Sequence, residues 1–218
     1  RNSRGAFVQG SFRGNLVIVG LPLLTRAMGE GAFAAAIVVL AVAMPLYNVL
    51  AVVALSYGRK EAGPGTIVRR VLLNPLVLAI IVGIAVSLLG IRLPGFVQKT
   101  GSYLGQMTFP LALLGIGAGM NRRMLTAGIR PTLLATALNN VLAPAITALA
   151  AFTAGLPADM TALLTILAAT PTAVSSFIMA RAMGADDDLA GSIVFISTMA
   201  SVVTISGVVL ALRTTGLL

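Results

Sequence analysis

Long runs without a charged side chain restrict the fold of this chain more than any other feature of its sequence. Six intervals of at least 21 residues contain no Asp, Glu, Lys or Arg. A helix needs about 20 predominantly apolar residues to cross the hydrocarbon core of a bilayer. We therefore expect six membrane-spanning helices, over residues 31–58, 71–91, 100–121, 131–158, 160–180 and 189–212.

The composition agrees with lipid as the solvent. Hydrophobic residues make up 58% of the chain and charged residues only 10%, whereas an ordinary soluble domain carries about 25% charged residues. The formal net charge of +9 would indicate a nucleic-acid or acidic partner in a soluble protein. Here nearly all basic residues lie between the uncharged runs, where they report membrane orientation. We therefore expect the protein to lie in a lipid bilayer and to bind no nucleic acid.

A seventh span is less regular and covers residues 5–25. Its first half carries Gln9, Ser11, Arg13 and Asn15, and its second half is apolar. The fold class expected is all-α: a polytopic transmembrane bundle of seven visible spans, forming a single transmembrane domain over residues 1–218.

Basic residues are distributed unequally between the two sides of the predicted bundle. Ten lie on the side where the chain starts and four on the other, with Arg13 left aside. Lys and Arg are enriched in cytoplasmic loops, so the start of the chain is expected in the cytoplasm and the C-terminus outside. The membrane expected is the plasma membrane, which in a bacterium is the inner membrane. The first residue is Arg1 and no signal peptide follows, so we expect the chain to begin inside a longer protein.

Residue types that are missing limit the chemistry. The chain has no cysteine and no histidine, which excludes thiolate metal sites and a His-Glu-x-x-His metalloprotease. No Asp or Glu lies inside a span, and the run of acidic residues at 186–188 is interpreted as the N-cap of a helix. We expect no cofactor and no enzyme activity, with an intramembrane enzyme or a channel kept as alternatives.

Two spans carry helix-breaking residues near their middle. One contains Gly14-Asn15 and the other Thr170-Pro171-Thr172. At about 1.5 Å per residue, both breaks fall near the bilayer midplane. The distribution of basic residues predicts that the two spans cross the membrane in opposite directions. Each span ends in the same tetrapeptide, Arg26-Ala27-Met28-Gly29 and Arg181-Ala182-Met183-Gly184.

Matching breaks of opposite polarity indicate an inverted repeat, an architecture in which transporters bind substrate at the repeat interface. A broken helix leaves backbone groups that lipid cannot satisfy, and we expect a substrate to supply their partner. Half-helix N-termini favour an anion. The expected substrate-binding residues are Arg13, Gly14, Asn15, Thr170, Pro171, Thr172 and Ser175. A sodium ion held by Thr172, Ser175 and Ser176 is a further hypothesis.

Structural roles compete with these assignments. Arg13 could extend its charge to the lipid headgroups, and Asn15 and Thr172 could simply hydrogen-bond between helices. For Asn139-Asn140 the sequence leaves open which amide lines a cavity and which one packs.

The motifs around both breaks resemble the auxin efflux carrier family, which includes plant PIN-type carriers and bacterial permeases for malonate and malate. The resemblance covers the whole chain and is carried by Gly14-Asn15 with Gly20-Leu21-Pro22-Leu23-Leu24, by Asn74-Pro75, and by Thr170-Pro171-Thr172 with Ala180-Arg181. It implies ten helices in two inverted five-helix repeats, with the fourth and ninth helices broken and crossing.

In that scheme residues 1–58 end the first repeat, residues 66–218 form the second, and three N-terminal helices precede them. Gly14 stands where the plant carriers have proline, and Thr172 where they tend to have an amide, which favours a small carboxylate over auxin. The function expected is a secondary transporter of a small organic anion, working by alternating access, with homodimer formation left open.

Overall fold

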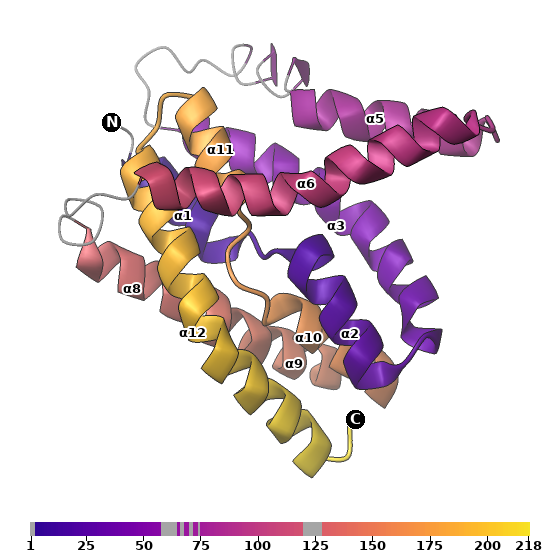
Figure 1. Cartoon of the computed structure of the whole chain (residues 1–218). Helices are drawn as coiled ribbons and strands as arrows, with labels where there is room; N and C mark the ends of the chain where they lie inside the picture. The colour runs from indigo at the N-terminus through magenta and orange to yellow at the C-terminus, as the bar shows by residue number, and fades with distance from the viewer. Residues whose placement is uncertain (1–2, 58–64, 66–67, 70–71, 74, 120–127) are drawn as a thin grey trace.

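The computed structural model describes residues 3–57, 65, 68–69, 72–73, 75–119 and 128–218. Within these residues every regular element is a helix, and the only extended pairing is a single antiparallel bridge between Gly14 and Thr172. The expected all-helical fold is therefore confirmed for this part of the chain (Figure 1).

Three helices are long and apolar enough to cross a membrane. They are α3 (Gly31–Ser56), the continuous run of α8 (Ile129–Ala137), η2 (Leu138–Leu142) and α9 (Ala143–Thr153), and α12 (Asp187–Thr214). Each coincides with a predicted span to within five residues. Asp186 is the N-cap residue directly before α12, and its carboxylate accepts a hydrogen bond from the backbone N–H of Leu189 at 3.1 Å, so the predicted capping role is confirmed.

The two irregular spans are divided as the sequence indicates. The first consists of α1 (Ser3–Phe12), a π-helical turn η1 (Leu16–Gly20) and α2 (Leu21–Met28). The second consists of α10 (Ala158–Ala168) and α11 (Ser175–Ala182). In Figure 1 the indigo link after α1 and the orange link after α10 pass each other in the middle of the molecule.

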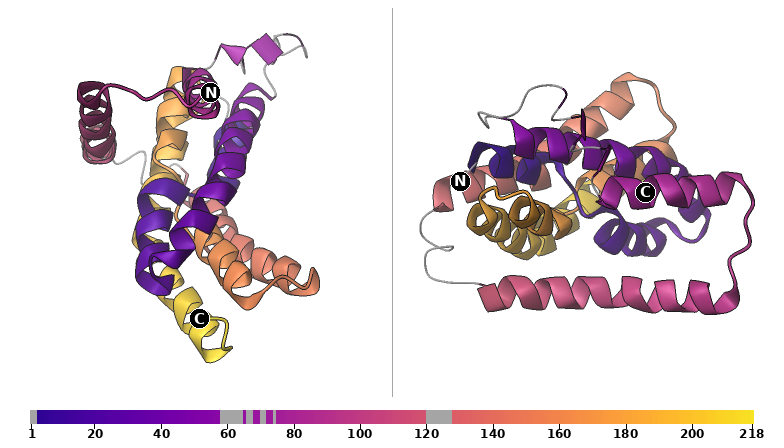
Figure 2. Two further views of the ribbon diagram at one scale, coloured as in Figure 1. Left: turned by 90° about the vertical axis from the view of Figure 1, so that its right-hand side faces the viewer. Right: turned by 90° about the horizontal axis from the view of Figure 1, so that it is seen from above.

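Helices α5 (Pro75–Leu88) and α6 (Gly95–Gly119) form an arm beside this body. Helix α5 contacts α3, while the described side chains of α6 are all exposed, and Figure 2 shows α6 standing apart from the other helices. Helix α6 begins five residues before the predicted span, because Lys99 does not end it: a lysine can carry its charge to the interface from within a helix.

Some sequence expectations lie outside the described residues. They concern Val71 at the start of one predicted span, Asn121 at the end of another, Asn74 of a resembling motif, and the basic residues Arg1, Arg59, Lys60, Arg70, Arg122 and Arg123.

Two apolar clusters lie on either side of the crossing. One is rich in alanine, with Ala6, Ala51, Ala135 and Ala190 buried among α1, α3, α8 and α12. The other joins η1 and α2 to α3, α10 and the end of α12. Small side chains let membrane helices approach closely, so the alanine cluster brings the polar residues at the end of α1 up against their neighbours.

Candidate functional site

The two interrupted helices are joined by their own backbone groups. The N–H of Asn15 donates to the carbonyl of Pro171, and the N–H of Ala173 donates to the carbonyl of Arg13, both at 2.8 Å. These groups were expected to be left for a ligand, and that part of the expectation is wrong: since the breaks are adjacent, each supplies the partner that the other lacks.

Side chains add further hydrogen bonds between the second break and its neighbours. The Thr172 hydroxyl donates to the carbonyl of Gly10 at 2.8 Å, and the Asn139 amide donates to the carbonyl of Thr170 at 2.9 Å. The N–H of Thr172 donates to the hydroxyl of Ser197 at 3.1 Å. Thr170, Pro171 and Thr172 therefore hold the crossing together.

The two breaks approach each other so closely at Gly14 that a side chain has no room there. A Cβ atom built on Gly14 would lie 2.5 Å from Oγ1 of Thr170, and Thr170 is fully buried. Only glycine lets the two chains pass this closely.

A cavity of about 260 Å³ opens beside the crossing. It is lined by four of the seven predicted binding residues: Arg13, Gly14, Asn15 and Ser175. Thr170, Pro171 and Thr172 lie at the crossing but do not line this cavity. Of the three residues in the sodium hypothesis only Ser175 lines it, while Ser176 is buried with a hydroxyl that has no partner among the described groups.

The starts of both second half-helices face the same cavity. Leu16, Val17 and Ile18 at the beginning of η1 line it, as do Val174 and Ser175 at the beginning of α11. The first N–H groups of a helix have no carbonyl partner within the helix and carry the positive end of its dipole. The cavity is thus bordered by two helix N-termini.

Arg13 is the dominant charge of the site. Its side chain is only 4% exposed. Arg13 therefore does not extend its charge to the lipid headgroups, which was the alternative role considered for it from the sequence. One terminal nitrogen donates to Oδ1 of Asn48 at 2.6 Å and the other to the sulfur of Met179. Both partners are neutral, and among the described residues no carboxylate pairs with this guanidinium.

The polar side chain of Asn15 is available in the same cavity. Asn15 is 6% exposed and its amide makes no capping hydrogen bond to the turn that follows it. Gln9, one helical turn before Arg13, is fully buried and also reaches the sulfur of Met179, with its carbonyl oxygen left without a partner among the described groups.

Helix α3 contributes residues that the sequence analysis missed. Met44 and Tyr47 line the cavity, and Asn48 holds Arg13. The available signal was the adjacent pair Tyr47-Asn48 in the middle of an otherwise apolar span, but a single polar residue in a membrane helix more often packs against a neighbour.

Asn139 and Asn140 both pack and neither lines this cavity. Asn139 holds the second break, as described above, and Asn140 donates to the carbonyl of Ser197 on α12 at 2.8 Å. Asn140 instead borders a separate, largely apolar pocket against α9 and α12.

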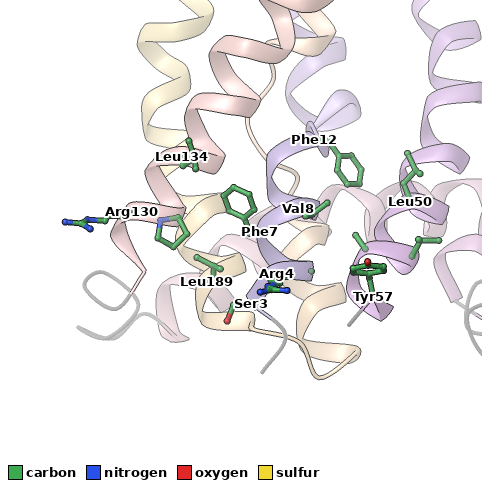
Figure 3. A pocket seen from close by; sticks show the side chains of 14 residues that line it. Ser3, Arg4, Phe7, Val8, Phe12, Leu50, Tyr57, Arg130, Leu134 and Leu189 are labelled. Carbon is green, nitrogen blue, oxygen red and sulfur yellow. The ribbon is translucent and has the colours of Figure 1, made fainter. Parts of the chain in front are cut away.

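A larger apolar groove of about 920 Å³ runs along α1, α3 and α8. Figure 3 shows Phe12 and Leu50 toward one end of it and Arg4 and Tyr57 toward the other. The ring of Phe12 meets that of Tyr47 edge-on, with centroids 5.8 Å apart, so this aromatic pair links the wall of the groove to the wall of the small cavity. The buried polar residues of the first break, Arg13 and Asn15, line the small cavity and not this groove.

The comparison with protein-family models gives one match. The model described as membrane transport protein matches residues 2–209, almost the whole chain. No curated protein matches the chain at a significant level.

Proposed function

The chain belongs to the family of membrane transport proteins that includes the auxin efflux carriers, and we propose that it is a secondary transporter of a small organic anion, a carboxylate, held in the cavity beside the crossing. The observation that carries this proposal is the buried guanidinium of Arg13 in the wall of that cavity, which no carboxylate of the described residues neutralises.

A buried cation without a counter-charge is costly. Taking a charged group out of water costs several kcal/mol unless it is paired and hydrogen-bonded, and ionisable residues at membrane depth mark substrate paths. The neutral acceptors Asn48 and Met179 offset only part of that cost. An anion entering the cavity would supply the missing charge.

The helix termini favour the same ligand charge. Two helix N-termini border the cavity, and the N-terminus of a helix carries a partial positive charge. With Arg13 they make a cation such as sodium an unfavourable occupant. The amide of Asn15 and the hydroxyl of Ser175 add neutral donors that suit carboxylate oxygens. The volume of about 260 Å³ favours a small molecule.

Opposed broken helices supply a mechanism for transport. We take residues 1–58 and 66–218 as parts of two inverted repeats and all seven spans as membrane-crossing, with the C-terminus outside and the bacterial inner membrane as the location. The adjacent breaks and the repeated Arg-Ala-Met-Gly endings support this scheme. Rocking of one helix group against the other would then expose the cavity to each side in turn.

Uptake of radiolabelled malonate and malate by the full-length protein in liposomes tests the proposal. Arg13→Gln is expected to raise KM about tenfold to a hundredfold, the range for losing hydrogen bonds to a charged group. Asn15→Ala is expected to raise KM in the same direction by a smaller factor.

Arg26→Gln is the matched control, because it removes the same charge from an exposed position in the last turn of α2. Its uptake should equal that of the unaltered protein. Equal carboxylate uptake by Arg13→Gln, Asn15→Ala and the unaltered protein would refute the proposal.

A further inference from the structure

We propose that Asn48 is a positioning residue of the anion site: it fixes the direction of the Arg13 guanidinium while leaving its charge for the substrate. The inference rests on the proposed function and extends it to a residue of α3 outside the two broken helices. It starts from the hydrogen bond of 2.6 Å between the Arg13 guanidinium and Oδ1 of Asn48.

The orientation of the Asn48 amide is determined by its two contacts. Oδ1 accepts from Arg13, and Nδ2 donates to the carbonyl of Met44 at 2.9 Å. Turning the amide over would set an N–H group against the guanidinium and an oxygen against the carbonyl, two repulsive contacts. Asn48 is only 2% exposed, so both bonds are shielded from bulk water. The acceptor is therefore fixed in place.

Because the acceptor at position 48 is a neutral amide, the charge of Arg13 is not cancelled. An aspartate at this position would form a buried ion pair with Arg13 and provide the counter-charge from within the protein. The amide holds the guanidinium without cancelling it. Met179, the second partner, is likewise neutral. A guanidinium has five N–H groups, and the two contacts leave others free to bind an anion.

The contact also ties three elements together at the cavity. Asn48 belongs to α3, Arg13 follows α1, and Met179 belongs to α11. Met44 lies one turn before Asn48 on the same face of α3 and lines the cavity. Asn48 thus places the charge between the first break, the second break and the α3 wall.

The experiment measures [14C]malonate uptake by the full-length protein in liposomes, together with the midpoint of thermal unfolding in detergent. Asn48→Leu is expected to raise KM about tenfold with little change in maximal rate, because the guanidinium loses its orientation. Asn48→Asp is expected to raise KM more than a hundredfold while leaving the thermal midpoint at or above that of the unaltered protein. A purely structural role would lower uptake and stability together.

A double-variant cycle with Arg13→Gln identifies the route of the effect. If Asn48 acts through Arg13, Asn48→Leu should cause no further rise in KM once Arg13 is Gln. Asn140→Leu is the matched control, since Asn140 is equally buried but faces α12, and it should leave KM unchanged even where it lowers stability.

The inference and the proposed function fail in distinguishable ways. An unchanged KM for Arg13→Gln would overturn both. A raised KM for Arg13→Gln with an unchanged KM for Asn48→Leu would overturn only the positioning role of Asn48. An equal rise caused by Asn48→Leu in the presence and absence of Arg13 would also overturn it.

Discussion

The crossing of the two breaks depends on a missing side chain, which makes Gly14→Ala the sharpest test of the fold at the site. The added methyl group would lie 2.5 Å from Oγ1 of Thr170, about 0.9 Å closer than the 3.4 Å at which ordinary contact begins. Thr170 cannot turn away freely, because it is fully buried and its hydroxyl donates to the carbonyl of Leu167 at 2.8 Å. Rotation about χ1 would break that hydrogen bond.

The cost follows from the packing on both sides. Inserting one methyl group into a closely packed site costs about 1–3 kcal/mol. Relief by separating the chains would stretch the two 2.8 Å bonds that join Asn15 to Pro171 and Ala173 to Arg13. We therefore expect Gly14→Ala to cost about 2–3 kcal/mol of stability, at the upper end of that range, and to displace Arg13 from its place in the cavity.

The stability is measured by thermal unfolding in detergent, monitored by size-exclusion chromatography. The integrity of the binding site is measured by the KM for malonate uptake. The double variant Gly14→Ala/Thr170→Ala should recover most of the lost stability, because it removes the atom that the new methyl group meets. Gly207→Ala on α12 is the matched control: nothing lies within 4 Å of the added Cβ there, so its stability should be equal or slightly higher.

Equal stability of Gly14→Ala and Gly207→Ala would show that the chains do not cross this closely. A loss that Thr170→Ala does not relieve would show that the clash is with another group. Either result would refute the reasoning.

Two further variants separate the parts that hold the fold from those that bind. Asn139→Leu leaves the buried carbonyl of Thr170 without its donor and should cost about 1–3 kcal/mol, measured as a lower thermal midpoint; an unchanged midpoint would mean that water replaces the amide. Asp186→Ala removes the side chain that caps α12 and should cost about 1 kcal/mol without altering the KM for malonate, and a raised KM would contradict the assignment of the site to the crossing.

The helical fold could be predicted because it depends on properties that act along the chain. Charge-free runs of more than 20 residues predicted α3 and α12 closely. The interruptions at Gly14-Asn15 and at Thr170-Pro171-Thr172 could be predicted as well, since proline and clustered polar residues disturb a helix wherever it lies.

The partners across the site could not be predicted from the sequence. Asn48 is 35 positions from Arg13, and Met179 is 166 positions away. No spacing rule joins residues so far apart. Their pairing depends on how α1, α3 and α11 pack, and that is set by the small residues of the alanine-rich cluster and not by the polar residues themselves.

The sequence prediction and the structure differ most in which groups pair with the backbone N–H and carbonyl groups at the two breaks. A single broken helix in lipid needs an outside partner for its free groups, and this argument assigned the carbonyl and N–H groups of the break to a ligand. Two adjacent breaks satisfy each other instead, through Asn15 with Pro171 and Ala173 with Arg13. What remains for an anion is the first turn of each following half-helix and the charge of Arg13. The crossing then needs no substrate to satisfy these backbone groups, so binding would not have to supply the energy that holds the two helices together.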